Sequence, residues 1–172
     1  MKYETDTWPR TCVACGHTAY RNPIPVVVII QPIDDGVLVI RRGIEPERGK
    51  LALPGGYLDW GETWQQGAVR ELAEETGMIV VPERVTLFDA VSTPDGLKVI
   101  LFALMPRVSA DTLPPFAATA ETLERTVINH VASLAFPMHT RVVARYFQQE
   151  PPPSTMRVGR QHETVTRKTA SA

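Results

Sequence analysis

The chain has 172 residues, which is enough for one domain with a substantial buried core. Hydrophobic residues make up 44% and charged residues 22%, and the formal net charge is −1, so the overall charge indicates neither a nucleic-acid partner nor an anionic membrane surface. The sequence has two cysteines, no secretory signal at its start and no apolar run near the ~20 residues of a membrane span, so we expect a cytoplasmic protein without a disulfide scaffold or a membrane partner.

Composition divides the chain into three regions. We expect an amino-terminal arm at residues 1–22 that holds both cysteines, and a folded domain at residues 23–150 that holds nearly all the periodic apolar sequence. Residues 151–172 begin with three prolines and contain few large apolar side chains, so they cannot bury enough surface to order themselves. We therefore expect a flexible carboxy-terminal tail.

The domain is predicted to begin with short strands. Runs of β-branched residues indicate strands at 26–30 and 37–40, and the Asp34-Asp35-Gly36 turn between them predicts a hairpin. A third strand is expected at 51–53, where the following Pro-Gly-Gly sequence ends it.

A helix is expected next, over residues 63–76. Thr63 and Gln66 have the spacing of a capping box, in which each residue's side chain accepts a hydrogen bond from the other's backbone N–H. Gly77 stands where a left-handed cap ends a helix.

The remaining apolar segments predict further strands and a second helix. The expected segments are strands at 78–81, 85–90, 97–105 and 123–128, a Pro- and Ala-rich loop at 106–119, and a helix at 137–149. The expected buried face of the last helix comprises Val142, Val143, Tyr146 and Phe147. Strands alternate with two separated helices, so we expect an α/β fold with a mixed sheet and helices on both faces.

The first helix concentrates acidic side chains on one face. At roughly 100° per residue, Glu71, Glu74 and Glu75 fall within about 100° of arc, while Leu72 and Thr76 face the opposite side and can pack on the sheet. Like charges on adjacent turns repel and lower helix stability, and a bound cation removes that repulsion. Crowded carboxylate oxygens suit a hard cation, so we expect Mg²⁺ or Mn²⁺ here.

Arg70 is the basic side chain expected to pair with this acidic face. It lies one turn before Glu74 and can hold that carboxylate by a charge-assisted hydrogen bond. Glu62, just ahead of the helix, is also free to pair with Arg70. A solvated acidic surface is the usual meaning of such a run, but it does not explain the fixed positions of these two residues.

The stretch from Gly55 to Val80, GGYLDWGETWQQGAVRELAEETGMIV, carries a resemblance. It resembles the Nudix box, G-x5-E-x7-R-E-U-x-E-E-x-G-U with U apolar, and it matches at every defined position from Gly56 to Met78. The resemblance implies a Nudix α/β/α sandwich that hydrolyses nucleoside diphosphates linked to another moiety, acts on a small nucleotide-derived substrate and often forms homodimers.

The resemblance also implies roles for particular residues. Glu71, Glu74 and Glu75 would be metal ligands and catalytic groups, one of them activating water, with Arg70 beside them. The carbonyl of Gly55 would join the metal shell. Many members add an acid from a later loop, and the candidates here are Glu121 and Glu124.

The arm contains Cys12-Val13-Ala14-Cys15-Gly16, which resembles half of the zinc ribbon that precedes the catalytic domain in NADH and FAD pyrophosphatase-type members. A structural zinc site takes four ligands. Two cysteines fall short, which favours a degenerate ribbon without zinc over a site completed by His17 or by a second chain. NADH-specific members also carry a Ser-Gln-Pro-Trp-type motif that residues 81–92 lack, so FAD or ADP-ribose is favoured over NADH.

Substrate contacts are weakly marked in the sequence. Arg41 and Arg42 precede the Nudix loop and are candidates for phosphate binding, although exposed charges at a strand end need no such role. Tyr57 and Glu124 are the other candidates, the first for stacking on a base, although aromatic packing at the helix start explains Tyr57 as well.

Two other functions share this fold. A nucleotide-sensing regulator of the Nudix fold typically loses box carboxylates or adds a DNA-binding domain, and this chain does neither. An enzyme that trims RNA ends shares the chemistry but needs a basic groove, which a net charge of −1 does not indicate. We therefore expect no nucleic-acid partner.

Overall fold

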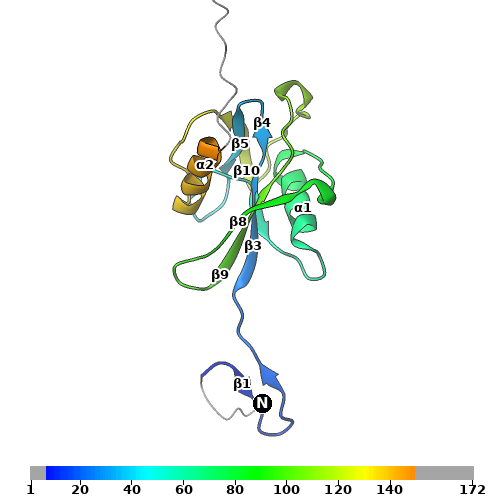
Figure 1. Ribbon diagram of the computed structural model, residues 1–172, viewed down its shortest axis with the longest axis vertical. Helices are drawn as coiled ribbons and strands as arrows, with labels where there is room; N and C mark the ends of the chain where they lie inside the picture. Colours follow the sequence, from blue (N-terminus) through cyan, green and yellow to red (C-terminus); the bar gives the residue numbers. More distant parts are fainter. Residues whose placement is uncertain (1–6, 150–172) are drawn as a thin grey trace, which may run out of the picture.

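Two four-stranded sheets lie between two helices in the computed structural model, which describes residues 7–149 (Figure 1). Helix α1 (Trp64–Thr76) lies on one side of the strands and helix α2 (Pro137–Gln149) on the other. This arrangement confirms the expected α/β class with helices on both faces. The tail predicted at 151–172 lies outside the described residues.

The strands form one mixed sheet and one antiparallel sheet. The mixed sheet has the order β7 (Gly55–Tyr57), β3 (Ile24–Ile30), β9 (Lys98–Leu104) and β8 (Thr86–Ser92), and β3 and β9 are its parallel pair. The second sheet has the order β10 (Thr122–Ile128), β5 (Gly36–Arg42) and β4 (Pro32–Ile33), with β6 (Leu51–Ala52) also paired to β5.

The predicted hairpin of the first two strands is wrong in its pairing. The turn at Asp34-Asp35 joins β5 to the two-residue β4, while β3 pairs with β9 in the other sheet. Pro32 has no N–H with which to continue a ladder, and the chain changes sheets there. Gln31 is fully buried at this point, and its side-chain amide donates to the carbonyls of Pro32 and Pro106 at 2.9 and 3.0 Å.

Alternate residues of the central strands enter two separate cores. Val28 and Ile30 of β3 pack in the core that contains Val142 and Tyr146 of α2. Val27, Ile29 and their neighbours pack in the core that contains Leu72 of α1. Because successive side chains of a strand point to opposite faces, a continuously apolar strand such as β3 serves both helices. Burying each such side chain contributes about 1.5–3 kcal/mol.

Helix α1 has the predicted capping. The Thr63 side chain accepts from the Gln66 N–H at 3.3 Å, and the Gln66 side chain accepts from the Thr63 N–H at 2.7 Å. Gly77 has φ of 75° and ends the helix. Arg125 of β10 donates to the last helical carbonyl, that of Thr76, at 2.5 Å, so the end of α1 is tied to the second sheet.

The segment at 78–81 does not form the predicted strand. Met78 is buried, but Ile79 is almost fully exposed, and the chain passes into a 3-10 turn at Pro82–Arg84. Gly77 ends α1 just before this segment and the 3-10 turn begins just after it, so only a few residues join the two. A second 3-10 turn, Ala110–Thr112, interrupts the long loop. Among residues 7–149 no helix is long and apolar enough to cross a membrane.

Helix α2 has the predicted bounds, and its face includes an unpredicted histidine. Val142, Val143 and Tyr146 are buried as expected, and His139 is buried beside them. The His139 Nδ1 accepts a hydrogen bond from the Leu53 N–H at 3.2 Å. Burial, with the charge of Arg42 adding to it, lowers the pKa of His139 to about 3.

We expect His139 to make the fold sensitive to acid. The unfolded chain takes up a proton near pH 6.5 while the native state excludes it until about pH 3, so stability is full above pH 6.5 and falls between these values. The slope approaches about 1.4 kcal/mol per pH unit. In urea unfolding from pH 7 to pH 4, His139→Asn keeps an acceptor for Leu53 and should lose most of this slope. An unchanged slope would assign the acid sensitivity to other groups.

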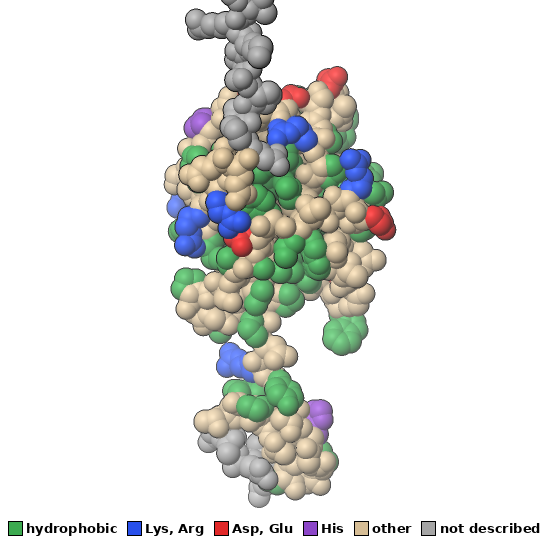
Figure 2. All heavy atoms as spheres, in the orientation of Figure 1, with side chains coloured by type: hydrophobic (Ala, Val, Ile, Leu, Met, Phe, Trp, Pro, Cys, Tyr) green, Lys and Arg blue, Asp and Glu red, His purple; other side chains and the backbone are tan. Residues whose placement is uncertain are grey.

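The amino-terminal arm is a small hairpin of its own. Strands β1 (Arg10–Thr11) and β2 (Thr18–Ala19) pair with each other and, within the described residues, with no strand of the body. The arm hangs below the body in Figure 1, and Figure 2 shows it as a separate lobe on a narrow neck with hydrophobic side chains on its surface.

Candidate active site

Two glycines allow the loop before α1 to lie against the acidic helix face. Gly55 has φ of 149°, and a Cβ there would lie 2.2 Å from the Val27 carbonyl oxygen, so only glycine fits this approach of β7 to β3. The Gly55 N–H donates to the Glu75 carboxylate at 2.8 Å. The loop residue predicted to bind metal therefore contacts one of the predicted metal ligands.

Gly56, the first residue of the box, lies against Glu71. A Cβ at this position would lie 2.4–2.7 Å from the Glu71 carboxylate atoms. The carboxylate occupies the space that a side chain would take, which explains why glycine stands here.

Arg70 joins the acidic residues of the site. It holds Glu62 with two bonds, from Nε at 3.1 Å and from Nη2 at 2.7 Å. Its Nη1 donates to Glu71 at 2.8 Å and, more weakly, to Glu74 at 3.3 Å, and Nη2 also donates to the Tyr57 carbonyl at 3.0 Å. The predicted contacts of Arg70 with Glu62 and Glu74 are both present, and Glu62 is its main partner.

The position of Glu62 depends on a residue that the sequence analysis missed. A Cβ at Gly67, inside α1, would lie 2.7 Å from the Glu62 carboxylate and 2.3 Å from the Leu58 side chain. Glycine within a helix costs stability relative to alanine. The presence of a glycine inside the predicted helix was therefore the one signal in the sequence that another group approaches the helix closely at this point. Arg70 lowers the pKa of Glu62 and keeps it ionised.

Two carboxylates of the helix are enclosed and lie close to a third acid. Burial raises the pKa of Glu71 and raises the pKa of Glu75 to about 7. The negative charge of Glu121 adds to both shifts. Of the two late acids considered from the sequence, Glu121 is therefore the one whose charge reaches this site.

Glu121 is placed by another glycine. The Gly43 N–H donates to the Glu121 carbonyl at 2.6 Å, and a Cβ at Gly43 would lie 2.1 Å from the Ala120 carbonyl oxygen. This contact brings the segment before β10 against the end of β5. Glu124 instead pairs with Arg41 across these strands at 2.6 Å.

The donors at this site are carboxylate oxygens, the ligand type that hard divalent cations prefer. Glu71 and Glu75 are costly to ionise because they are desolvated and repel each other, and a cation between them removes that cost. Within residues 7–149, no three His, Cys, Asp or Glu side chains already converge in ligand geometry. Arg70 holds Glu71 and Glu74 in this arrangement.

The two arginines predicted to bind substrate differ in their surroundings. Arg41 is committed to Glu124 and to the Gly49 carbonyl, which it contacts at 2.9 Å. Arg42 donates to the Pro46 carbonyl at 2.8 Å and stacks on Phe136 at 5.1 Å, and among the described residues no carboxylate forms an ion pair with it. The positive charge of Arg42 nevertheless acts on Glu75, where it partly offsets the rise in the Glu75 pKa.

The aromatic candidate Tyr57 is half-exposed on β7. The Lys98 ammonium lies 5.2 Å from its ring centroid, while its carbonyl accepts from Arg70. Trp60 is fully exposed in the same loop. Tyr57 as a whole is 52% exposed.

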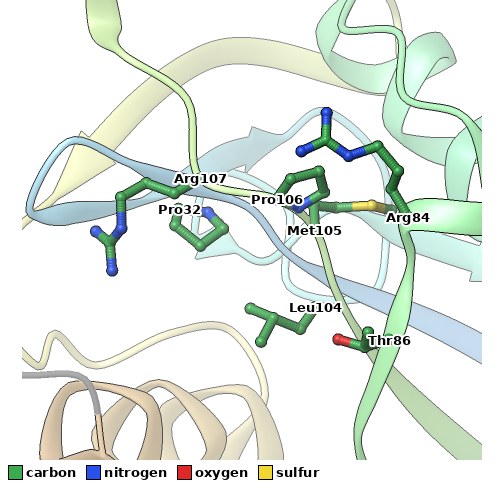
Figure 3. Close-up of a pocket in the computed structure, with 7 residues that line it drawn as sticks. All are labelled: Pro32, Arg84, Thr86, Leu104, Met105, Pro106 and Arg107. Atoms are coloured by element: carbon green, nitrogen blue, oxygen red, sulfur yellow. The ribbon is translucent and has the colours of Figure 1, made fainter.

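A cavity of about 330 Å³ lies away from these residues (Figure 3). It is lined by Pro32, Arg84, Thr86, Leu104, Met105, Pro106 and Arg107. The two arginine side chains point in different directions, and Arg107 donates to the Tyr146 hydroxyl at 3.0 Å. None of the acidic residues of α1 lines this cavity.

Residues 22–149 match the family model described as the NUDIX domain. The chain belongs to the Nudix family. This confirms the resemblance drawn from the box. The match begins at residue 22, so the comparison of the arm with a zinc ribbon stays a prediction.

Several named proteins match part of this chain in sequence. An ADP-ribose pyrophosphatase of Methanocaldococcus jannaschii is 41% identical over 76 residues, which are 44% of this chain and 44% of that protein. The 8-oxo-dGTP diphosphatase of Escherichia coli is 34% identical over 84 residues, 47% of this chain and 64% of that protein. The NAD-capped RNA hydrolase NudC of Edwardsiella ictaluri is 30% identical over 73 residues, 42% of this chain and 28% of that protein. The chain thus spans less than two thirds of each relative.

Solved Nudix structures share the fold. A NUDIX hydrolase from Nitrosomonas europaea has a TM-score of 0.62 at 26% identity, over 82% of this chain and 79% of that chain. A bifunctional NMN adenylyltransferase/ADP ribose pyrophosphatase from Francisella tularensis has a TM-score of 0.61 at 22% identity, over 76% of this chain and 42% of that chain. These structures confirm the predicted Nudix fold with a mixed sheet.

Proposed function

We propose that this chain is a metal-dependent hydrolase that adds water to the diphosphate bridge of a nucleoside diphosphate linked to another moiety, ADP-ribose or FAD before NADH. The observation that carries the proposal is the pair of enclosed carboxylates, Glu71 and Glu75, held against a glycine loop by Gly55 and Gly56. The similarity to an ADP-ribose pyrophosphatase supports the same substrate class.

Glu71, Glu74 and Glu75, with the carbonyl of Gly55, would hold Mg²⁺ or Mn²⁺. When bound, such a cation neutralises the diphosphate oxygens and lowers the pKa of a coordinated water. The chain's own residues set the geometry. Arg70 fixes the orientation of Glu71 through a guanidinium that Glu62 and the Tyr57 carbonyl hold in turn.

Arg42 is the better candidate of the two arginines for binding the diphosphate. It has no carboxylate partner among the described residues, whereas Arg41 is occupied by Glu124. We expect Arg42→Gln to raise KM by about tenfold, the equivalent of losing one charge-assisted contact. Arg41→Gln is the matched control and should change KM by less than about threefold. Steady-state kinetics on ADP-ribose distinguishes them, and equal effects would reject this assignment.

A substrate panel tests the proposed reaction. The panel contains ADP-ribose, FAD, NADH, dinucleoside polyphosphates, nucleoside triphosphates and capped RNA, each incubated with Mg²⁺ or Mn²⁺ and analysed by product mass. We expect two monophosphates from the preferred substrate, AMP and ribose 5-phosphate from ADP-ribose or AMP and FMN from FAD. Preferential cleavage of nucleoside triphosphates or of RNA ends would overturn the substrate assignment. Tight binding of nucleotides without any turnover would indicate a regulator instead.

A further inference from the structure

The start of helix α2 bonds to β6 and to the residue that follows β6. The Leu51 carbonyl accepts from the Ala135 N–H at 2.7 Å, and the Leu53 N–H donates to the His139 Nδ1 at 3.2 Å. Backbone groups of alternate residues in a strand point to the same edge, so these are the two groups that a neighbouring strand would otherwise use. The start of α2 therefore takes the place of a strand at this edge.

His139 is the one side chain in this contact, and it is enclosed. Leu53 is 2% exposed and His139 6%, and a buried N–H is costly to leave without an acceptor. An imidazole nitrogen accepts a hydrogen bond only while it carries no proton. Burial lowers the pKa of His139 to about 3, so its Nδ1 is an acceptor at neutral pH.

The bond from His139 reaches the glycine loop through a stiff connection. Leu53 lies two residues before Gly55, whose N–H donates to the Glu75 carboxylate at 2.8 Å. Pro54 joins them, and its ring fixes its own φ and restricts the residue before it. The Pro54 carbonyl accepts from the Ile29 N–H of β3 at 2.8 Å. A shift at Leu53 therefore passes to Gly55 with little freedom to absorb it.

The ring of His139 has a second neighbour, on the side of Arg42. The ring centroids of His139 and Phe136 are 5.0 Å apart in an edge-to-face arrangement, and the Arg42 guanidinium lies 5.1 Å from the Phe136 ring. Arg42 is the arginine proposed above to bind the diphosphate. The ring of His139 thus acts toward Arg42 and its Nδ1 toward the loop, so substitutions can separate the two effects.

We propose that His139 is a positioning residue of the hydrolase, whose Nδ1 holds Leu53 and thereby keeps the Gly55 loop in place against Glu75. Helix α2 then supports, from one side of the strands, a site whose carboxylates lie on α1 at the other side (Figure 1). His139 acts through the backbone and not on the substrate. The inference rests on the proposed function, because it gives His139 a part in that reaction.

Two substitutions of similar shape test the nitrogen alone. Asparagine places an acceptor where the Nδ1 stands, and leucine has nearly the same shape without one. With ADP-ribose and saturating Mg²⁺, we expect His139→Leu to lower kcat about tenfold, as for one lost hydrogen bond, and His139→Asn to stay within about threefold. Both variants lose the ring, so a rise in KM transmitted through Phe136 and Arg42 should be equal in the two. If His139→Leu does not fold, His139→Gln, whose amide lies one carbon farther out, replaces it with the same expected loss.

Thr140→Val is the matched control. The Thr140 Oγ1 accepts from the Leu134 N–H at 3.0 Å, a similar bond at the start of the same helix that does not involve the loop. Its kcat should equal that of the wild type even where its melting temperature falls. Hydrogen exchange of the Leu53 and Gly55 amides, measured without substrate, should quicken at least about tenfold in His139→Leu and stay near the wild-type rate in His139→Asn and Thr140→Val.

The outcomes separate this inference from the proposed function. Unchanged kcat and unchanged amide exchange in His139→Leu, with an active wild type, would overturn the inference and leave the function standing. Equal losses of kcat in His139→Leu and His139→Asn, or a similar loss in Thr140→Val, would assign the effect to packing or stability and also overturn it. A wild type that cleaves no substrate of the panel would reject the proposed function itself.

Discussion

Glu75→Gln should lower kcat at least ~100-fold without unfolding the protein, because it removes the charge of a proposed metal ligand from the site at which we propose that transition-state charge is stabilised. The glutamine is isosteric, and its side-chain oxygen can still accept the Gly55 N–H that Glu75 accepts at 2.8 Å. The loop therefore stays in place while the charge is lost. Glu74→Gln should have a similar effect on turnover.

Glu75→Gln should lower turnover but should not lower, and can raise, the stability of the metal-free protein. The pKa of Glu75 is raised to about 7 mainly by burial, so the native state carries a penalty for the ionised form that begins above pH 4.5 and is complete above pH 7. Without metal, the melting temperature of Glu75→Gln should therefore equal or exceed that of the wild type at pH 8. This advantage should disappear as the pH falls toward 4.5.

Glu124→Gln is the matched control for these effects. Glu124 is also a carboxylate of the domain, but it pairs with Arg41 on the exposed strands. Its loss should change turnover by less than about threefold, since exposed pairs contribute little. Normal turnover in Glu75→Gln and Glu74→Gln would show that the box is structural in this chain.

Arg70→Lys should lower both activity and stability although it keeps the charge. Lysine cannot reproduce the planar fork that holds Glu62 and Glu71 at once. Arg70 is 28% exposed and Glu62 15%, so the partly buried carboxylates lose their donors at a cost of about 1–2 kcal/mol. We expect turnover to fall by roughly 10² because Glu71 loses its orientation.

A double-mutant cycle with Glu62→Gln checks this mechanism. If Arg70 acts through Glu62, the effects of the two changes on stability should be strongly non-additive. Urea unfolding of the four proteins measures the coupling. Additive effects together with unchanged turnover in Arg70→Lys would show that Arg70 does not position the site.

Local patterns predicted the helices better than they predicted strand pairing. The capping residues of α1 and the apolar spacing of α2 are local properties. Helix α2 has the expected bounds, and α1 differs from its expected bounds only at Thr63, which is the N-cap rather than the first helical residue. Pairing depends on distant segments. Continuous apolar sequence at 26–30 indicated a buried strand, but not that β3 would lie parallel to β9, about seventy residues later in the chain.

In the candidate site, too, local spacing in the sequence predicted the contacts within the helix but not the contacts between distant segments. The box predicted the acidic face and the contacts of Arg70, because fixed helical offsets place Glu71, Glu74 and Glu75 together. It did not reveal that Gly43 brings Glu121 near these residues, since that contact joins separate strands. Nor did it distinguish Arg41 from Arg42, whose partners come from other parts of the fold.

Hydrolysis of ADP-ribose as a function of magnesium concentration, in the wild type and Glu75→Gln, tests the central claim most directly. The account predicts that the wild type releases AMP and ribose 5-phosphate in a magnesium-dependent manner and stops when the metal is chelated. It predicts at least ~100-fold lower turnover for Glu75→Gln at every magnesium concentration. Equal turnover of the two proteins, or wild-type turnover that persists under chelation, would contradict a metal-dependent reaction at these carboxylates.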